Sequence, residues 1–444
     1  MSIVSASDRY LKLRKLAYEF AFCVTPGDFV DHWERHSDIL QGCRMVLSNP
    51  SLASPLPAGL HERTFGADPK AYLNGFFLSS GLFFFSPELV RLHKSGEPIT
   101  DIKLDFSVSL DSNVIGDIHK FMKGKSLDAR QTAFLEMATY LRRNEINLDA
   151  TPYLFENFQK AITDPKHFDF VVNGFATFFR FSTGVPLREN PESLSDFAFS
   201  LSEIEAHHHA QKVVSEMTGD SALIEEETRR LWHRLDSRYA LLLTAIEYFG
   251  RRFSSLDDKL DWLLGTLEKD VGRIPEREFV FAFLAFAAPH NHPFFANQWP
   301  VPYNRAQNIV DLVRNMAWDL TFYRTMQTWA TKSDRGDFAI PLFLTFDWKL
   351  AGLHDIYSCR LMLIDDHGKD VFCYSQHDIR EVLQSLGLWN RLEQYFNEQR
   401  VLQRMAKRAS HDDLAKRCRE AEEELHQIIY ARPCEKTGDP STAK

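Results

Sequence analysis

Polar and apolar residues alternate most regularly in the stretch that ends at Asp111. Every second residue from Ile102 to Leu110 is apolar, and lysine, aspartate or serine stands between these positions. A period of two is typical of a β-strand with one buried face. We therefore expect a strand here that ends at a carboxylate. Further along, the pattern predicts a helix over residues 129–143, a short strand over 145–148 and a helix over 152–162.

Helical periodicity accounts for much of the remaining chain. We expect the helix over 152–162 to be capped by Thr151 and to begin at Pro152, because threonine is a good N-cap and proline fits the first helical turn. The other helices are expected over residues 8–22, over most of 190–288 and over 305–329.

The last third of the chain mixes both periods. A strand over 342–345 is expected to open after Pro341, and strands over 360–364 and 370–374 are expected to form a hairpin. From residue 378 to 431 the pattern predicts a long C-terminal helix. Its apolar runs, 388–402 and 414–428, are out of phase, so a single unbroken coiled coil is not expected.

Composition narrows the class of protein. With 444 residues, 44% hydrophobic and 25% charged, the chain is globular in type. A net charge of -9 argues against a general nucleic-acid coat. The six cysteines form no Cys-x-x-Cys pair, so we expect reduced thiols in the cytoplasm. The apolar run 279–288 is much shorter than the ~20 residues of a spanning helix, so we expect no membrane association.

Carboxylates occur at or near the ends of several predicted elements. Asp111 follows the alternating strand in the sequence Asp-Ser-Asn, and Glu156 lies on the helix that begins at Thr-Pro. Asp319 lies beside the apolar stripe of the 305–329 helix, and Asp347 follows a strand in the sequence Thr-x-Asp-x-x-Leu. Each acid also has a plainer interpretation: Asp111 and Asp347 as turn residues, Glu156 and Asp319 as members of solvated helix faces.

Taken in order, these motifs resemble the PIN-like metal-dependent ribonucleases over residues 101–165 and 303–352. The resemblance implies an α/β core with a short, mostly parallel sheet flanked by helices. The family's middle section is compact, so the long helical stretch between the two matching segments predicts a helical insertion, and the last segment predicts a long C-terminal helix. The corresponding regions are an N-terminal mixed region over 1–100, a core divided between 101–165 and 303–377, an insertion over 166–302, the C-terminal extension over 378–432 and a polar tail over 433–444.

The resemblance implies an Mg²⁺ or Mn²⁺ site. Asp111, Asp319 and Asp347 would be ligands, and Glu156 a fourth ligand or a water-orienting group, with Asp149 as the alternative acid. Hard ions of this kind prefer oxygen ligands, neutralise the charge that develops on a phosphodiester and acidify bound water. Side chains that would orient the ligands from a second layer are Asn113, Thr345 and Asn315.

Basic and histidine-rich stretches are the other candidates. Arg400, Arg404, Lys407 and Arg408 fall in a basic part of the predicted C-terminal helix and would bind RNA phosphates, or else form a solvated helix face. The triplet 207–209 is all histidine, but neighbouring helical residues point about 100° apart and cannot converge on one ion. His290 and His292 have His-x-His spacing in a proline-rich loop, for which an ordinary polar loop is the plainer interpretation.

We therefore expect a metal-dependent endoribonuclease that hydrolyses RNA phosphodiester bonds. A role as a toxin or phage-defence effector is suggested only by the resemblance. Two alternatives stay open: a DNA-directed nuclease using the same site, and a non-catalytic interaction protein with a degenerate core. A homo-oligomer or a protein partner would use the C-terminal helix. Nucleotide-binding glycine loops, the Gly-x-Ser-x-Gly motif and the His-Glu-x-x-His motif are absent from the sequence.

Overall fold

The computed structural model describes residues 3–23, 25–51, 62–95, 102–287, 309–331, 337–375 and 378–430. Contacts divide the chain into two compact units. The first comprises residues 1–230 and 322–377, and the second comprises 231–321 and 378–444. His290, His292 and the predicted tail over 433–444 lie outside the described residues.

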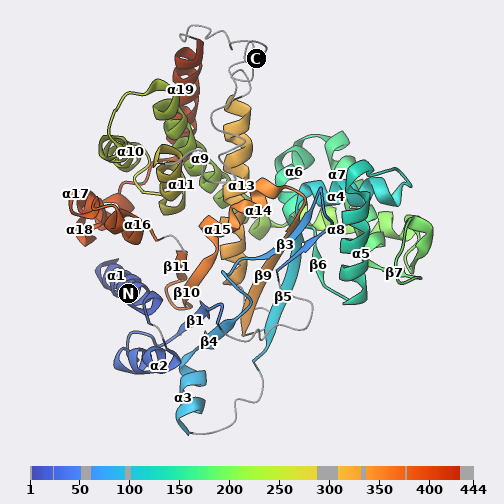
Figure 1. Ribbon diagram of the computed structural model, residues 1–444, viewed down its shortest axis with the longest axis horizontal. Coiled ribbons are helices and arrows are strands. Elements are labelled where there is room, and N and C mark those ends of the chain that lie inside the picture. The colour runs from blue at the N-terminus through green and yellow to red at the C-terminus, as the bar shows by residue number, and fades with distance from the viewer. Residues whose placement is uncertain are drawn as a thin grey trace, which may run out of the picture. The chain divides into compact units, whose positions relative to one another are not determined.

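A five-stranded sheet forms the centre of the first unit (Figure 1). Its strand order is β2-β3-β9-β5-β6, with β5 parallel to both β9 and β6, and β3 antiparallel to β9. The predicted alternating strand is β5. The strands are β2 (Arg63–Phe65), β3 (Ala71–Gly75), β9 (Phe338–Thr345), β5 (Leu104–Leu110) and β6 (Leu148–Asp149).

Helices gather beside the β5–β6 edge of this sheet (Figure 1). They include α4, which follows β5 directly, and α6, which packs against β5. The helices here are α4 (Ser112–Met122), η1 (Asp128–Arg130), α5 (Gln131–Arg143), α6 (Thr151–Thr163), α7 (Pro165–Ser182) and α8 (Glu203–Gly219). After β9 come two short helices, α14 (Trp348–Gly352) and α15 (His354–Tyr357).

A second, antiparallel sheet with strand order β11-β10-β1-β4 belongs to the same unit. Residues 1–100 thus supply strands to both sheets. Leu16 and Phe20 of α1, with Trp33 of α2, pack with this sheet in one apolar core. The elements are β1 (Cys43–Ser48), β4 (Leu82–Phe85), β10 (Cys359–Asp365), β11 (Asp370–Ser375), α1 (Ile3–Ala21), α2 (Pro26–Arg35) and α3 (Pro87–Ser95).

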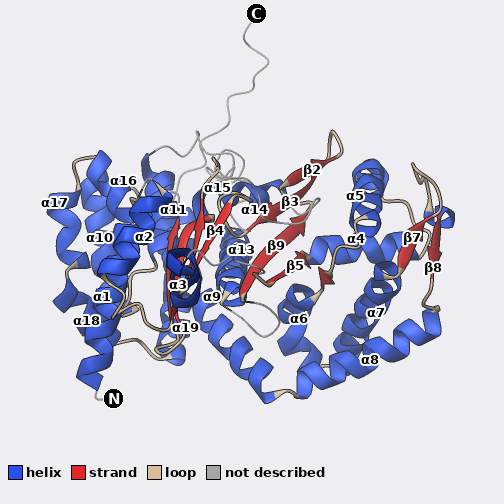
Figure 2. Ribbon diagram, turned by 90° about the horizontal axis from the view of Figure 1, so that it is seen from below, coloured by secondary structure: helices blue, strands red, loops and turns tan. Residues whose placement is uncertain are grey.

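The region expected to be helical contains one small hairpin. Strands β7 (Gly184–Pro186) and β8 (Phe197–Phe199) pair only with each other, around η2 (Leu194–Asp196). Figure 2 shows this hairpin apart from the five-stranded sheet. The main sheet therefore gains no strand from the stretch between α7 and α9 (Ser221–Gly250).

The second unit is helical throughout its described residues. Helices α9 and α13 (Ile309–Ala330) each contain a boundary between the units. The other elements of the unit are α10 (Leu256–Asp270), α11 (Glu276–Ala287), α16 (Ile379–Ser385), α17 (Trp389–Leu392), η4 (Glu393–Phe396), α18 (Glu398–Met405) and α19 (His411–Tyr430).

The prediction of one long C-terminal helix is wrong. Gly387 adopts a φ of 70°, a left-handed conformation that ends α16 before the chain reaches α17. The Asn397 side chain caps the start of α18, and Ser410 accepts a hydrogen bond from the backbone N of Asp413 at the start of α19. These starts and stops explain why the two apolar runs were out of phase. A partner contact through this segment stays a prediction.

Two local predictions also need correction. Pro341 lies inside β9 rather than before it, and its carbonyl accepts a hydrogen bond from the Phe76 N–H at 3.0 Å. The N-cap of α6 is Ala150, while the Thr151 hydroxyl bonds to Asp149 instead of capping the helix. None of the described helices combines the length and the apolar character that crossing a membrane requires.

Candidate active site

Acidic side chains collect where the three parallel strands of the main sheet end. Leu110 of β5 is in register with Leu344 of β9, and Ser109 of β5 is in register with Asp149 of β6. Asp111 and Asp347 follow the ends of β5 and β9. The carboxyl edge of parallel strands is where α/β proteins bind ligands. The topology thus brings together acids that are more than 200 residues apart in the sequence.

Asp111 stands at the N-cap position of α4, but its side chain makes no capping hydrogen bond. One oxygen, Oδ2, instead accepts a hydrogen bond from Thr345 Oγ1 at 2.9 Å and another from Asn113 Nδ2 at 3.2 Å. The Asp111 side chain is therefore not used to cap the helix that it precedes. The two side chains expected to orient this acid both contact it, and their functional role stays a prediction.

Asp347 has a structural task of its own. Its Oδ1 accepts a hydrogen bond from the Lys349 N–H at 2.8 Å and caps the short helix α14. Its own backbone N–H donates to Thr345 Oγ1 at 2.9 Å. Thr345 thus links the backbone of Asp347 to the carboxylate of Asp111, which holds the ends of β5 and β9 in a definite relation.

Glu156 and Asp149 differ in how they are held. The Ser112 hydroxyl donates to Glu156 Oε2, which ties α6 to the start of α4. Asp149 is bound within its own turn, because Thr151 donates to Oδ1 from both its N–H and its hydroxyl, and Ser109 Oγ donates to Oδ2 at 3.3 Å. With both oxygens of Asp149 engaged, the geometry favours Glu156 as the second acid.

The electrostatics of the site penalise negative charge. The pKa of Asp111 is raised to about 6, mainly by burial and also by the charges of Glu156 and Asp347, while the hydrogen bonds from Thr345 and Asn113 oppose the rise. Around Glu156, removal of the carboxyl from water raises its pKa, against the lowering effect of the Ser112 hydrogen bond. A bound cation would reduce the free-energy penalty for ionising these carboxyl groups.

The donor set suits a hard cation, although the cluster is open. In the described residues of the first unit, the ligand atoms of Asp111, Glu156 and Asp347 do not all lie within 4.8 Å of one another. Mg²⁺ usually takes only one or two direct carboxylates and keeps several waters. Asp111 as a direct ligand, with the other two acids bound directly or through water, is compatible with this coordination.

Asp319 and Asn315 belong to the other unit. Both lie on the part of α13 that precedes residue 322, where Asp319 is half-buried and Asn315 is exposed. Their predicted convergence with Asp111 stays a prediction.

A cavity of about 250 Å³ lies along the same strands of the first unit. Asp105 and Ser107 of β5 line it together with Asp149 and Thr151. Its apolar wall includes Phe155 and the half-buried Trp329. The Phe155 ring is buried and the Arg230 guanidinium covers its face at 3.2 Å, so Trp329 is the more accessible of the two rings. A partly exposed aromatic ring beside polar groups is a surface on which proteins stack unpaired bases.

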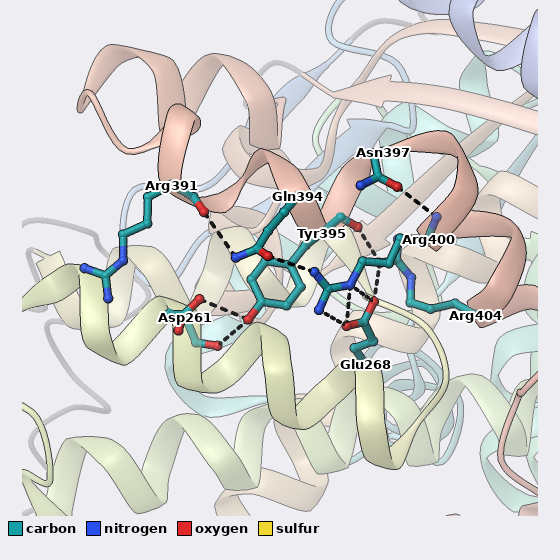
Figure 3. A network of polar contacts seen from close by, with 8 residues as sticks. All are labelled: Asp261, Glu268, Arg391, Gln394, Tyr395, Asn397, Arg400 and Arg404. Atoms are coloured by element: carbon teal, nitrogen blue, oxygen red, sulfur yellow. Dashed lines mark hydrogen bonds and ion pairs between the residues drawn. The ribbon is translucent and has the colours of Figure 1, made fainter.

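The predicted nucleic-acid contacts of Arg400 and Arg404 are opposed by the structure (Figure 3). Arg404 is only 8% exposed, and its guanidinium donates to Glu268 at 3.0 Å and to the Tyr395 carbonyl. Arg400 binds the same Glu268 and stacks on the Tyr395 ring, 4.4 Å from its centroid. Both guanidinium groups are thus engaged inside the second unit, where the single Glu268 carboxylate balances one of the two charges. Lys407 and Arg408 are exposed, and Arg408 approaches Asp236 at 3.9 Å.

Sequence reasoning missed two side chains near the acids. Ser112 had a readable signal, since a hydroxyl directly after a strand-ending aspartate can contact a neighbouring acid. Arg130 had none. It pairs with the buried Asp117 at 2.7 Å and lies over the Phe346 ring, 5.7 Å from its centroid, next to Thr345 and Asp347. Arg130 is thus a half-buried cation beside the end of β9 whose charge is paired with Asp117.

Comparison of the chain with protein-family models, with curated proteins and with solved structures finds no match.

Proposed function

We propose that this protein is a metal-dependent endoribonuclease whose site is built around Asp111. The observation that carries the proposal is the state of this carboxylate. It stands at the end of a central parallel strand, it is not used as a helix cap, and neighbouring acids help to raise its pKa to about 6. Such an arrangement costs free energy unless it serves a cation or a proton transfer.

The side chains of the site would have separate roles in this reaction. Asp111, Asp347 and Glu156 would hold Mg²⁺ or Mn²⁺, whose chemistry when bound is to neutralise phosphate charge and to acidify water. Thr345 and Asn113 keep Asp111 Oδ2 in place, so the carboxylate needs no rearrangement when substrate arrives.

Single-stranded RNA is the substrate that the surroundings favour. The cavity lined by Asp149 offers the half-buried Trp329 ring for stacking, and stacking needs an unpaired base. The chain carries no large positive excess, as its net charge of -9 indicates, so recognition would be local. We place the activity in the cytoplasm, because the five cysteines that the structure describes are all free.

The test is cleavage of end-labelled single-stranded RNA, duplex RNA and single-stranded DNA with Mg²⁺, with Mn²⁺ or with chelator. We expect cleavage of single-stranded RNA that requires the metal. Asp111→Asn should abolish it, because the amide keeps the shape and removes the charge. Asp169→Asn, which alters an exposed acid on α7 of the same unit, is the matched control and should cleave normally.

Three results would count against the proposal. Cleavage of DNA but not RNA would support the DNA-directed alternative. Cleavage that persists in Asp111→Asn would assign the activity to a contaminant or to another site. No cleavage of any substrate by a folded, metal-loaded protein would leave the interaction-protein alternative.

A further inference from the structure

Three metal-ligating side chains meet in the helical hairpin formed by α1 and α2. Glu19 lies in the last turn of α1, His32 lies in the last turn of α2, and His36 is the C-cap residue of α2. One carboxylate oxygen and two imidazole nitrogens from these residues all lie within 4.8 Å of one another. Among the residues that the structure describes, this is the one group of three with that property.

The two helices supply the ligands by different means. His32 and His36 are four residues apart, so they project from the same side of the α2 backbone. Their ring centroids are 4.8 Å apart. Glu19 comes from the neighbouring helix, and its Oε2 lies 3.1 Å from His32 Nε2. All three side chains are half-buried, so solvent and ions can reach them.

Buried aromatic rings and a helix cap hold the hairpin in place around the three side chains. The fully buried Phe20 ring meets the His32 ring edge-on at 4.8 Å, and it also packs against Phe29 and Trp33. At the start of α2, Thr25 and Asp28 form a capping box around Pro26. Packing of this kind limits the rotamers of the ligands, as a metal site requires.

We propose that Glu19, His32 and His36 bind a divalent transition-metal ion of the Zn²⁺ type. Two imidazole nitrogens and one carboxylate oxygen suit Zn²⁺, Co²⁺, Ni²⁺ or Fe²⁺, whereas Mg²⁺ prefers oxygen ligands throughout. Three protein ligands leave a coordination position for water or a further ligand, as in catalytic zinc sites.

The inference is independent of the nuclease proposal. Its donors are nitrogen-rich, and they belong to the hairpin on the antiparallel sheet rather than to the ends of the parallel strands. The bound ion would join α1 to α2 and stabilise the hairpin. The competing interpretation is an ordinary hydrogen bond between His32 and Glu19 with a second histidine near it.

The experiment uses the full chain, stripped with chelator and titrated with Co²⁺ as a spectroscopic probe and with Zn²⁺ by calorimetry. In the presence of a large excess of Mg²⁺, which occupies the carboxylate site around Asp111, we expect one Co²⁺ per chain with visible d–d absorption that Zn²⁺ displaces. Zn²⁺ should also raise the melting temperature of the wild-type protein.

His36→Gln is the main variant, because it removes one ligand and leaves the His32–Glu19 contact. It should weaken Zn²⁺ binding by more than about 100-fold, beyond the effect of losing an outer-shell partner. Glu19→Gln is the second variant, which keeps the side-chain shape and should also lose affinity. The matched control replaces the exposed His207 and His208 by glutamine and should bind like wild type.

Each possible result distinguishes the proposed metal site from its alternatives. Equal Zn²⁺ affinity in wild type, His36→Gln and Glu19→Gln would overturn the proposal. Loss of binding only in the His207 and His208 control would assign the metal to the exposed triplet. Zn²⁺ binding that depends on His36 would support the site even if no nuclease activity is found, so the two proposals can fail separately.

Discussion

The raised pKa of Asp111 makes a measurable prediction about stability. An ordinary aspartate has a pKa of 3.8, and in the folded protein that of Asp111 is about 6. The folded state therefore holds this proton more tightly than the unfolded chain does. As the pH rises from about 4 to about 6, the unfolded chain loses the proton first, and the folded protein loses stability. Above about pH 7, where the folded carboxyl is also ionised, the penalty is complete and constant.

The size of the penalty follows from the two pKa values. A difference of about 2 pKa units corresponds to about 3 kcal/mol. Because Asp111 is only half-buried, solvent screening reduces this value, and we expect about 1–2 kcal/mol. Asp111→Asn removes the charge and keeps an oxygen that can accept from Thr345 and Asn113, both of which bond to Oδ2 alone.

The assay is urea and thermal unfolding of metal-free wild type and Asp111→Asn at pH 4, 6 and 8. At pH 8 the variant should be more stable by about 1–2 kcal/mol, and the gain should disappear near pH 4, where the wild-type carboxyl is protonated. Asp169→Asn, the exposed control, should differ by less than about 0.5 kcal/mol at each pH. A variant that is less stable at pH 8, or a gain that does not change with pH, would refute the reasoning.

Adding Mn²⁺ extends the same experiment. A ligand at 100 times its dissociation constant stabilises the folded state by about 2.7 kcal/mol. If Asp111 is a ligand, Mn²⁺ should stabilise wild type and have little effect on Asp111→Asn, so the order of stability at pH 8 should reverse. An equal Mn²⁺ response in both proteins would show that the ion binds elsewhere.

Three further predictions concern single substitutions. Asp347→Asn should keep the cap of α14, since asparagine caps as well as aspartate, and should lose RNA cleavage; normal cleavage would remove Asp347 from the site. Arg404→Ala should destabilise the protein in urea by about 1–3 kcal/mol, because the buried Tyr395 carbonyl loses its donor while Arg400 still pairs with Glu268, whereas Lys407→Ala should change stability by less than about 0.5 kcal/mol. If Arg404→Ala and Lys407→Ala changed stability equally, Arg404 would not be part of a stabilising buried network. Gly387→Ala should cost about 1–2 kcal/mol for left-handed strain alone, and Gly272→Ala should cost more, because a Cβ there would lie 2.6 Å from a backbone oxygen; comparable melting temperatures would contradict this.

Local patterns in the sequence were sufficient for several elements of the first unit. The alternation that ends at Leu110 predicts β5, and the two apolar stretches around residue 367 predict the hairpin of β10 and β11. Such predictions succeed because the pleat of a strand and the side-chain order along it are set by neighbouring residues. The same strand patterns located Asp111 and Asp347. Asp111 comes directly after β5, and Asp347 comes two residues after the end of β9.

The partners of those elements were decided by the tertiary structure. Residues 1–100 show no pattern that would divide their strands between two sheets, because pairing depends on which distant edge is available. Arg404 and Lys407 look alike in a basic run, yet only Arg404 is buried against an acid that lies 136 residues earlier. Charge in a sequence does not reveal its neutralising partner.

The same division between sequence and tertiary structure applies to the proposed metal site of Glu19, His32 and His36. The spacing of the two histidines was present in the sequence, and helical geometry alone places them on one face. The third ligand comes from another helix, and the angle at which α1 packs against α2 is fixed by buried rings such as Phe20 and Trp33. The residue types that bind a metal can therefore be read from the sequence, but their convergence depends on helix packing, which side chains from both helices determine together.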